Sequence, residues 1–266
     1  MKKFFLGLAA VIALAASAAA RDTGSMYNNR MVAKASTFTA TPAGGGGGGY
    51  EVKIATAWQG PKVRQNGGED NAMTVTMAPS TGSLIVVGAI AGSSFTTVVD
   101  SRGNTFSLNK FTGPVGGIST AMWHFIATAT YNGGYVVTVN VEGASSIISS
   151  VLVASVTAGA TPSVDVTTNT SASLSNSVSI GTVTTSATTD LVVACFADDG
   201  GLNNAIATSG TKLIAMFAEA DGTSFARGAC AFQTLDVRST TTNGQWNLAV
   251  GVLNSSVAIA TAFKWQ

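Results

Sequence analysis

The stretch VVDSRGNTFSL, residues 98–108, guides the interpretation of this chain, because a related stretch, AIATSGTKLIAM, follows at residues 205–216. In both, apolar residues flank a short polar turn that contains a glycine, Gly103 in the first and Gly210 in the second. The two glycines are 107 positions apart. A constant offset of this kind is expected where a chain has been built by duplicating one unit.

The offset extends over most of the chain. At 107 positions, residues 84–87 (LIVV) align with residues 191–194 (LVVA). Beyond Phe125 the offset becomes 111, and it aligns Tyr135 with Trp246, Ile148 with Ile259, and Leu152 with Phe263. One four-residue insertion before Gly244 explains the change. We therefore predict two pseudo-repeats, about residues 50–157 and 158–266; the alternative is a chance similarity between two valine-rich stretches.

The hydrophobic pattern predicts strands and no helix after residue 20. Residues 135–141 alternate between apolar and polar, which is typical of a half-buried strand. Residues 84–90, 147–156 and 191–196 are continuous apolar runs of strand length, as expected for a sheet covered on both faces. Pairs such as Asn-Gly and Gly-Gly separate these segments and favour turns. The chain is therefore expected to be all-β.

A resemblance to a known group adds detail. Residues 97–106, TVVDSRGNTF, are similar to a v-x-D-s-x-G-N-t-[YF] turn of jelly-roll-like β-sandwich modules in secreted bacterial and phage proteins. As in those modules, an SLIVV strand precedes the turn at residues 83–87 and an aromatic strand, MWHF, follows at 122–125. The resemblance covers roughly residues 81–263. It implies a jelly-roll-like antiparallel β-sandwich, here with an internal pseudo-duplication, and a non-catalytic part of a surface or adhesive protein.

We expect one β-sandwich domain over residues 50–266, because no flexible tract interrupts the chain between the two repeats. Two tandem immunoglobulin-like domains are the alternative.

Residues 1–20 resemble a signal peptide, with Lys2 and Lys3 before an apolar run and with Ala18, Ala19 and Ala20 at the cleavage site. Residues 21–49 end in six glycines and are predicted to be a flexible arm or linker. An arm that pairs with a neighbouring subunit is the alternative.

Charge and export limit the partners. Removing Lys2 and Lys3 from the 14 basic residues leaves 12, against 13 acidic residues. Without a basic surplus or cluster, binding to nucleic acid is not expected. After signal cleavage no apolar run is long enough to insert into a membrane. We expect a secreted protein, extracellular or on the cell surface, with the periplasm as a further location.

No set of residues predicts catalysis. His124 is the single histidine, and it lies in the predicted strand at residues 118–126, where an imidazole bonded within the sheet is the simpler interpretation. A zinc site built on several histidines is excluded, and no carboxylate pair stands out. Asp198, Asp199 and Asn203 are candidate ligands for a structural calcium, although solvated turn residues are the simpler interpretation. We therefore predict a protein that is not an enzyme and has no cofactor; a secreted hydrolase using His124 is the third reading.

We expect a surface, structural or adhesive protein whose partners are surface polymers or further copies of itself. The alternative is a carbohydrate-binding module, with exposed aromatic rings as its platform. The candidates for that platform are Trp58 and Tyr131, and also Trp246 and Trp265. Trp246 aligns with Tyr135 in a strand, so a core position is expected for it.

The repeat also predicts a disulfide between Cys195 and Cys230. Two cysteines in an exported chain tend to form a bond. The 107 offset places Cys195 on Gly88 and Cys230 on Trp123, so that a small and a large side chain in one repeat correspond to two of middle size in the other. Neighbours that fill one densely packed space are expected to exchange volume in this way. Two separate buried thiols are the alternative.

Overall fold

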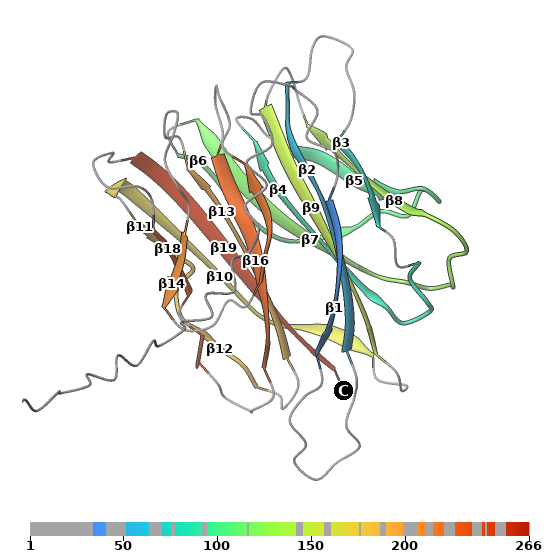
Figure 1. Cartoon of the computed structure of the whole chain (residues 1–266). Coiled ribbons are helices and arrows are strands. Elements are labelled where there is room, and N and C mark those ends of the chain that lie inside the picture. Colours follow the sequence, from blue (N-terminus) through green and yellow to red (C-terminus); the bar gives the residue numbers. More distant parts are fainter. Residues whose placement is uncertain are drawn as a thin grey trace, which may run out of the picture. The chain divides into compact units, whose positions relative to one another are not determined.

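The computed structural model describes residues 34–40, 52–63, 71–75, 78–91, 95–115, 117–141, 146–156, 161–175, 177–186, 190–198, 207–210, 215–220, 227–235, 241–242, 244–247 and 254–265. Strands β1 to β19 are the regular elements in these ranges, and their pairings are antiparallel, so the chain is all-β (Figure 1). Within this part of the chain there is no helix with the length and hydropathy needed to cross a membrane.

The first repeat contributes a six-stranded and a three-stranded sheet. The larger sheet has the order β1-β2-β9-β4-β7-β6, and its strands are Lys34–Ala40, Val52–Val63, Ser146–Val156, Leu84–Ala91, Ile118–Ile126 and Ser107–Val115. The smaller sheet has the order β3-β8-β5, with Asn71–Val75, Tyr135–Val141 and Phe95–Asp100. Strand β8 alternates between buried and half-buried residues, as its sequence predicts, and every residue of β4 is buried.

The second repeat contributes a five-stranded sheet and two smaller ones. The larger sheet has the order β10-β19-β13-β16-β15, with Pro162–Ser175, Asn254–Trp265, Asp190–Asp198, Arg227–Leu235 and Ala215–Ala220. The three-stranded sheet β11-β18-β14 contains Ser177–Ser179, Gly244–Asn247 and Ala207–Gly210. The remaining pair is β12, Val183–Thr184, with β17, Thr241–Thr242.

The order of strand pairing is the same in both repeats. Strands β2, β9, β4, β7 and β6 of the first large sheet correspond one by one to β10, β19, β13, β16 and β15 of the second. Strands β3, β8 and β5 likewise correspond to β11, β18 and β14. An irregularity is repeated as well: the register shifts between Leu108 and Lys110 in β6, and between Met216 and Ala218 in β15. A β-bulge at matching places in two sheets is a specific feature, and it supports the interpretation that one unit was duplicated.

The strand registers correct the alignment within two strands. Gly88 pairs with Met122 in β7, and Cys195 pairs with Cys230 in β16, so Met122 and not Trp123 is the counterpart of Cys230. In β19, Ile259 pairs with Cys195 and therefore corresponds to Ser150, which pairs with Gly88. The slip is one residue in β16 and two residues in β19, and a sequence offset does not detect slips of this size between two apolar strands.

Three buried clusters fill the spaces between the sheets. The first lies between the two sheets of the first repeat and includes Val87, Trp123 and Tyr135. The second joins the two large sheets, since it combines Leu84, Val86 and Met122 with Leu191, Ile259 and Phe263. The third covers the other face of the five-stranded sheet and includes Phe196 and Ile180. Each large sheet is therefore apolar on both faces, which explains the uninterrupted apolar runs in its central strands.

The predicted arm is partly a strand. Residues 34–40 form β1, which pairs with β2 of the same chain from Lys34 opposite Trp58 to Ala40 opposite Val52. This corrects the expectation of a linker without a strand over these residues. The proposed signal peptide and the glycine run at residues 44–49 lie outside the described residues.

Candidate functional site

The polar centre of the first repeat is the turn that follows β5. Asp100 Oδ1 accepts hydrogen bonds from the backbone N–H groups of Arg102 and Asn104, both at 2.9 Å. Its Oδ2 accepts from Asn104 Nδ2 at 2.9 Å and from the hydroxyls of Tyr131 at 2.8 Å and Tyr135 at 3.1 Å. Gly103 has φ 80°, a value that glycine adopts without steric cost. The DSRGN motif is therefore a turn closed by one buried carboxylate.

The electrostatics of this turn stabilise an ionised Asp100. Burial alone would raise the pKa of Asp100, but the hydrogen bonds from Asn104, Tyr131 and the Arg102 backbone outweigh it and hold the pKa below its ordinary value. Burial and the neighbouring carboxylate raise the pKa of Tyr131 to about 12 and also raise that of Tyr135. A general acid or base needs a pKa near the working pH. These shifts move the pKa values of Asp100, Tyr131 and Tyr135 further from neutral pH.

His124 also has a structural environment. It lies in β7, Ile118–Ile126, the strand expected from the sequence, and Nδ1 is hydrogen-bonded to Oδ1 of Asn109 on β6. Its ring lies 5.8 Å from that of Phe263 in β19, at an interplanar angle of 56°. Burial lowers the pKa of His124, so the imidazole is neutral near pH 7. The imidazole thus lies between the two large sheets.

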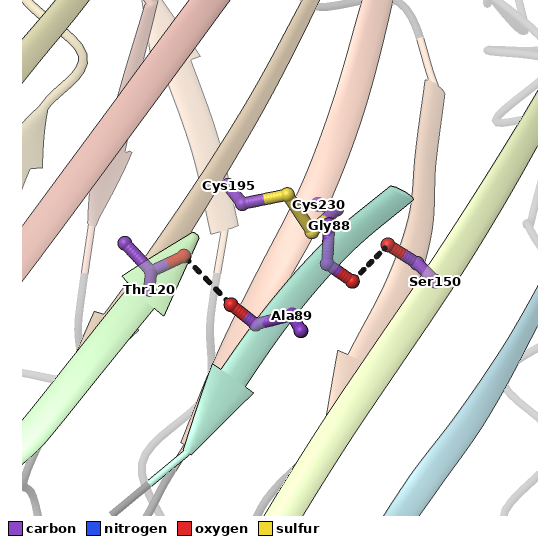
Figure 2. The surroundings of a disulfide bond; sticks show 6 residues. All are labelled: Gly88, Ala89, Thr120, Ser150, Cys195 and Cys230. Atoms are coloured by element: carbon purple, nitrogen blue, oxygen red, sulfur yellow. Dashed lines mark hydrogen bonds between the residues drawn. A yellow bond between two sulfur atoms is a disulfide. The ribbon is translucent and has the colours of Figure 1, made fainter. Parts of the chain in front are cut away.

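Cys195 and Cys230 form a disulfide, with Cα atoms 4.1 Å apart on the neighbouring strands β13 and β16. The bond packs against Gly88 of β4 (Figure 2). A Cβ added at Gly88 would lie 2.3 Å from Cys195 Sγ and 2.9 Å from Cys230 Sγ. The expectation that Gly88 makes room for the Trp123 indole is therefore wrong: the space is taken by the disulfide, while Trp123 belongs to the cluster on the opposite face of the sheet.

The candidate metal ligands remain separate. Asp198 is buried at the end of β13, and Asp199 and Asn203 lie outside the described residues. Over the described ranges, no three or more His, Cys, Asp or Glu side chains gather in a way that could hold a metal ion. Elsewhere, Asp165 accepts a hydrogen bond from the Ser186 N–H at 2.7 Å and forms an ion pair of 3.1 Å with Lys264. This pair links β10 to β19 and has a structural role.

The aromatic candidates for a glycan platform are also not exposed where they are described. Tyr131 is only 5% exposed; its hydroxyl binds Asp100, and its ring packs at 4.7 Å from Tyr135 and carries the Arg102 guanidinium at 4.3 Å. Trp265 is buried as well. The side chains of Trp58 and Trp246 lie outside the described set, although Trp246 belongs to β18.

One surface hollow was not anticipated from the sequence. It has a volume of about 390 Å³ and is lined by Phe95, Thr96, Thr97, Val98, Thr105, Phe106, Leu108, Phe111 and Trp123. These residues come from β5, the following turn, β6 and β7. The sequence feature that could have indicated the hollow is the pair of apolar residues Leu108 and Phe111 in an otherwise polar strand. Strand periodicity alone does not show that these two residues lie on a surface. We refer to this hollow as the β5–β6 groove.

Comparison of the chain with protein-family models, with curated proteins and with solved structures gives no match.

Proposed function

We propose that the protein is an exported, non-catalytic β-sheet protein that acts as a surface, structural or adhesive component. The proposal depends on one observation: the side chains that could take part in catalysis are already engaged in bonds within the fold. Asp100 accepts five hydrogen bonds within its own turn region, His124 is bonded to Asn109, and both cysteines form the disulfide. In the described part of the chain these groups stabilise the fold and are not free to act on a substrate.

The disulfide supports export, because a structural disulfide persists in an oxidising compartment and is rare in the cytosol. The basic start and the apolar run of residues 1–20 agree with this location. Only 10% of the residues are charged, and both faces of each large sheet are covered by a buried cluster. These properties suit a stable structural protein. Its partners on this proposal are surface polymers or copies of itself.

Expression of the full chain in a bacterial host tests the proposal. We expect a mature protein whose mass corresponds to removal of about 20 residues, found outside the cytoplasm, with no thiol that reacts after denaturation. A full-length chain with two free thiols in the cytoplasm would overturn the export part. Size-exclusion chromatography and electron microscopy test self-association, and a strictly monomeric species at high concentration would leave only the adhesive version.

The second candidate function is carbohydrate binding. Tyr131 does not support carbohydrate binding, because it is buried. The role of Trp58 as an exposed binding ring remains a prediction. The observation that favours it now is the aromatic lining of the β5–β6 groove.

A further inference from the structure

The β5–β6 groove opens at the edge of the first repeat. Strand β5 is the outer strand of the three-stranded sheet and β6 is the outer strand of the six-stranded sheet, so the groove lies where the two sheets end side by side. Its deep residues are those of the first buried cluster, among them Val98, Phe106 and Trp123. The buried cluster therefore forms the floor of the groove. A concave site with an apolar floor and a few polar groups at its rim is the usual form of a small-ligand site.

The groove exposes aromatic surface that the core does not require. Among the described residues, three large hydrophobics are exposed, and two of them, Leu108 at 56% and Phe111 at 38%, line this groove. The Phe95 ring stands edge-on to Phe111 at 6.4 Å and to Trp123 at 5.3 Å, and so links the exposed ring to the buried indole. Phe111 is therefore held by ring contacts while part of its surface faces solvent. A ring fixed in this way binds a ligand with little loss of side-chain entropy.

The second repeat shows that the fold does not demand these rings. The pairing Val87–Trp123 corresponds to Ala194–Ala231, so the counterpart of Trp123 is an alanine. Phe111 pairs with Ala121 as Glu219 pairs with Ala229, so the counterpart of Phe111 is a glutamate. The same strands with the same bulge therefore form with Ala and Glu at these two positions. At these two positions the aromatic rings belong to the first repeat alone, which indicates a role beyond packing.

The chemistry of the lining selects the ligand. None of the nine lining residues that the structure describes is charged, so this lining offers no group to neutralise an ionic ligand, and a buried charge without a partner is costly. Thr96 and Thr105 are exposed and add hydroxyls, each a donor and an acceptor, to the lining, while the Thr97 hydroxyl accepts a hydrogen bond from Asn140 Nδ2 at 2.9 Å. Flat apolar faces ringed by hydroxyl partners match a pyranose, whose C–H face is apolar and whose edge carries hydroxyls. We propose that the β5–β6 groove binds a neutral saccharide, an inference that rests on the proposal that this protein works by binding.

Titration of the mature protein with a panel of neutral oligosaccharides, monitored by NMR and calorimetry, tests the assignment. We expect binding of at least one neutral glycan, with chemical-shift changes centred on Phe111, Thr96 and Trp123. Phe111→Ala should weaken that binding by about threefold to tenfold, as expected for the loss of one stacking ring. Val164→Ala is the matched control, because Val164 is also 38% exposed but is not among the residues that line the groove. It should leave the affinity unchanged.

The remaining arms separate this inference from its competitors. Oligosaccharides with the same linkage that carry uronic acids should bind at least tenfold more weakly, and an octyl alcohol should not compete. Binding of the alcohol in preference to every glycan would overturn the saccharide assignment and indicate an apolar ligand. Glycan binding that Phe111→Ala leaves intact would place the site elsewhere and also overturn it. If no glycan binds while the protein is still exported and disulfide-bonded, the groove inference fails and the proposed function stands.

Discussion

The carboxylate of Asp100 joins residues that are far apart in the chain. It binds its own turn through Arg102 and Asn104, and it binds the start of β8 and the segment before it through Tyr135 and Tyr131. Phe106 N–H then donates to Val98 O, which returns the chain along β5. The turn therefore fixes the position of β5 beside β8, and with it one wall of the β5–β6 groove. The hydrogen-bond network is strongest while the carboxylate is ionised, because bonds to a charged acceptor are stronger than bonds to a neutral one.

This dependence predicts a pH effect. Because the folded pKa of Asp100 lies below its ordinary value of 3.8, the carboxylate contributes stability that is fully present above about pH 4 and is lost as the pH falls through the folded value. Asp100→Asn should reduce the free energy of unfolding by about 2 to 3 kcal/mol at pH 7, since one oxygen replaces two acceptors. Urea unfolding at pH 7, 5 and 3 measures it. The gap between wild type and Asp100→Asn should narrow at pH 3; a gap that stays constant would contradict the assignment.

Gly88 gives a second prediction at the scale of one residue. Gly88→Ala should lower the free energy of unfolding by about 1 to 3 kcal/mol, because the new methyl group overlaps both sulfur atoms. Gly134→Ala is the matched control: its Cβ would meet only Thr74 Cγ2, at 3.5 Å, in ordinary contact. In a Cys195→Ala, Cys230→Ala background the penalty of Gly88→Ala should shrink, since the sulfur atoms are gone. An unchanged penalty there would show that another contact causes the loss.

For single residues, the sequence predicted which bonds they form better than it predicted which other residues they contact. It predicted the disulfide and the position of His124 in a strand. It did not predict that Gly88 faces the disulfide, because that contact forms between the two repeats and depends on which face of β4 each residue occupies. The sequence also suggested Tyr131 as an exposed ring. The hydrogen bond from Tyr131 to Asp100 joins residues 31 positions apart, and no local sequence pattern predicts such a contact.

At the scale of elements, the disulfide ties two adjacent strands of the second repeat. Its sulfur atoms are buried between the two large sheets, in the second buried cluster. The sequence separation is 35 residues. Cys195→Ala with Cys230→Ala should therefore lower the free energy of unfolding by about 3 to 4 kcal/mol by the chain-entropy estimate. Chemical denaturation under non-reducing conditions measures the loss, and a loss below about 1 kcal/mol would contradict it.

The same burial predicts resistance to reductant. A reducing agent must reach a sulfur atom, and both cysteines have side chains that are almost fully covered. Incubation of the native protein with dithiothreitol, followed by alkylation and mass determination, should leave the bond intact, whereas the same treatment in urea should reduce it. Reduction of the native protein at the same rate as in urea would show that the strands open locally.

Strands were the most predictable elements. Period-two alternation and apolar runs located β4, β7, β8, β9 and β13 to within a few residues, because each pattern reports how many faces of a strand are covered. Register was less predictable: the offset of 111 aligned Leu152 with Phe263, whereas the pairing of β19 with β13 aligns Ala154 with Phe263. In strands made of small apolar residues, a slip of one or two positions leaves the hydrophobic pattern nearly unchanged.

At the scale of the whole described part, the two repeats contact each other reciprocally. Strand β6 contacts β10 and β19, and its counterpart β15 contacts β2 and β9, which are the counterparts of β10 and β19. Strand β4 contacts β13, its own counterpart, and Gly88 meets Cys195, the residue that corresponds to it. Reciprocity of this kind is the property of an isologous dimer interface. We therefore interpret the pair as a dimer-like arrangement within one chain, which the offset of 107 alone could not reveal.

This arrangement predicts that the chain unfolds in one cooperative transition. The second buried cluster draws residues from both large sheets, so separating the repeats would expose an apolar face on each. Calorimetry should show a single transition with equal calorimetric and van't Hoff enthalpies. Met73→Ala, in the outer core of the first repeat, and Ile180→Ala, in that of the second, should each lower the midpoint of the whole transition by roughly 5 °C or more. Two transitions, with each substitution shifting only one of them, would instead describe two independent domains.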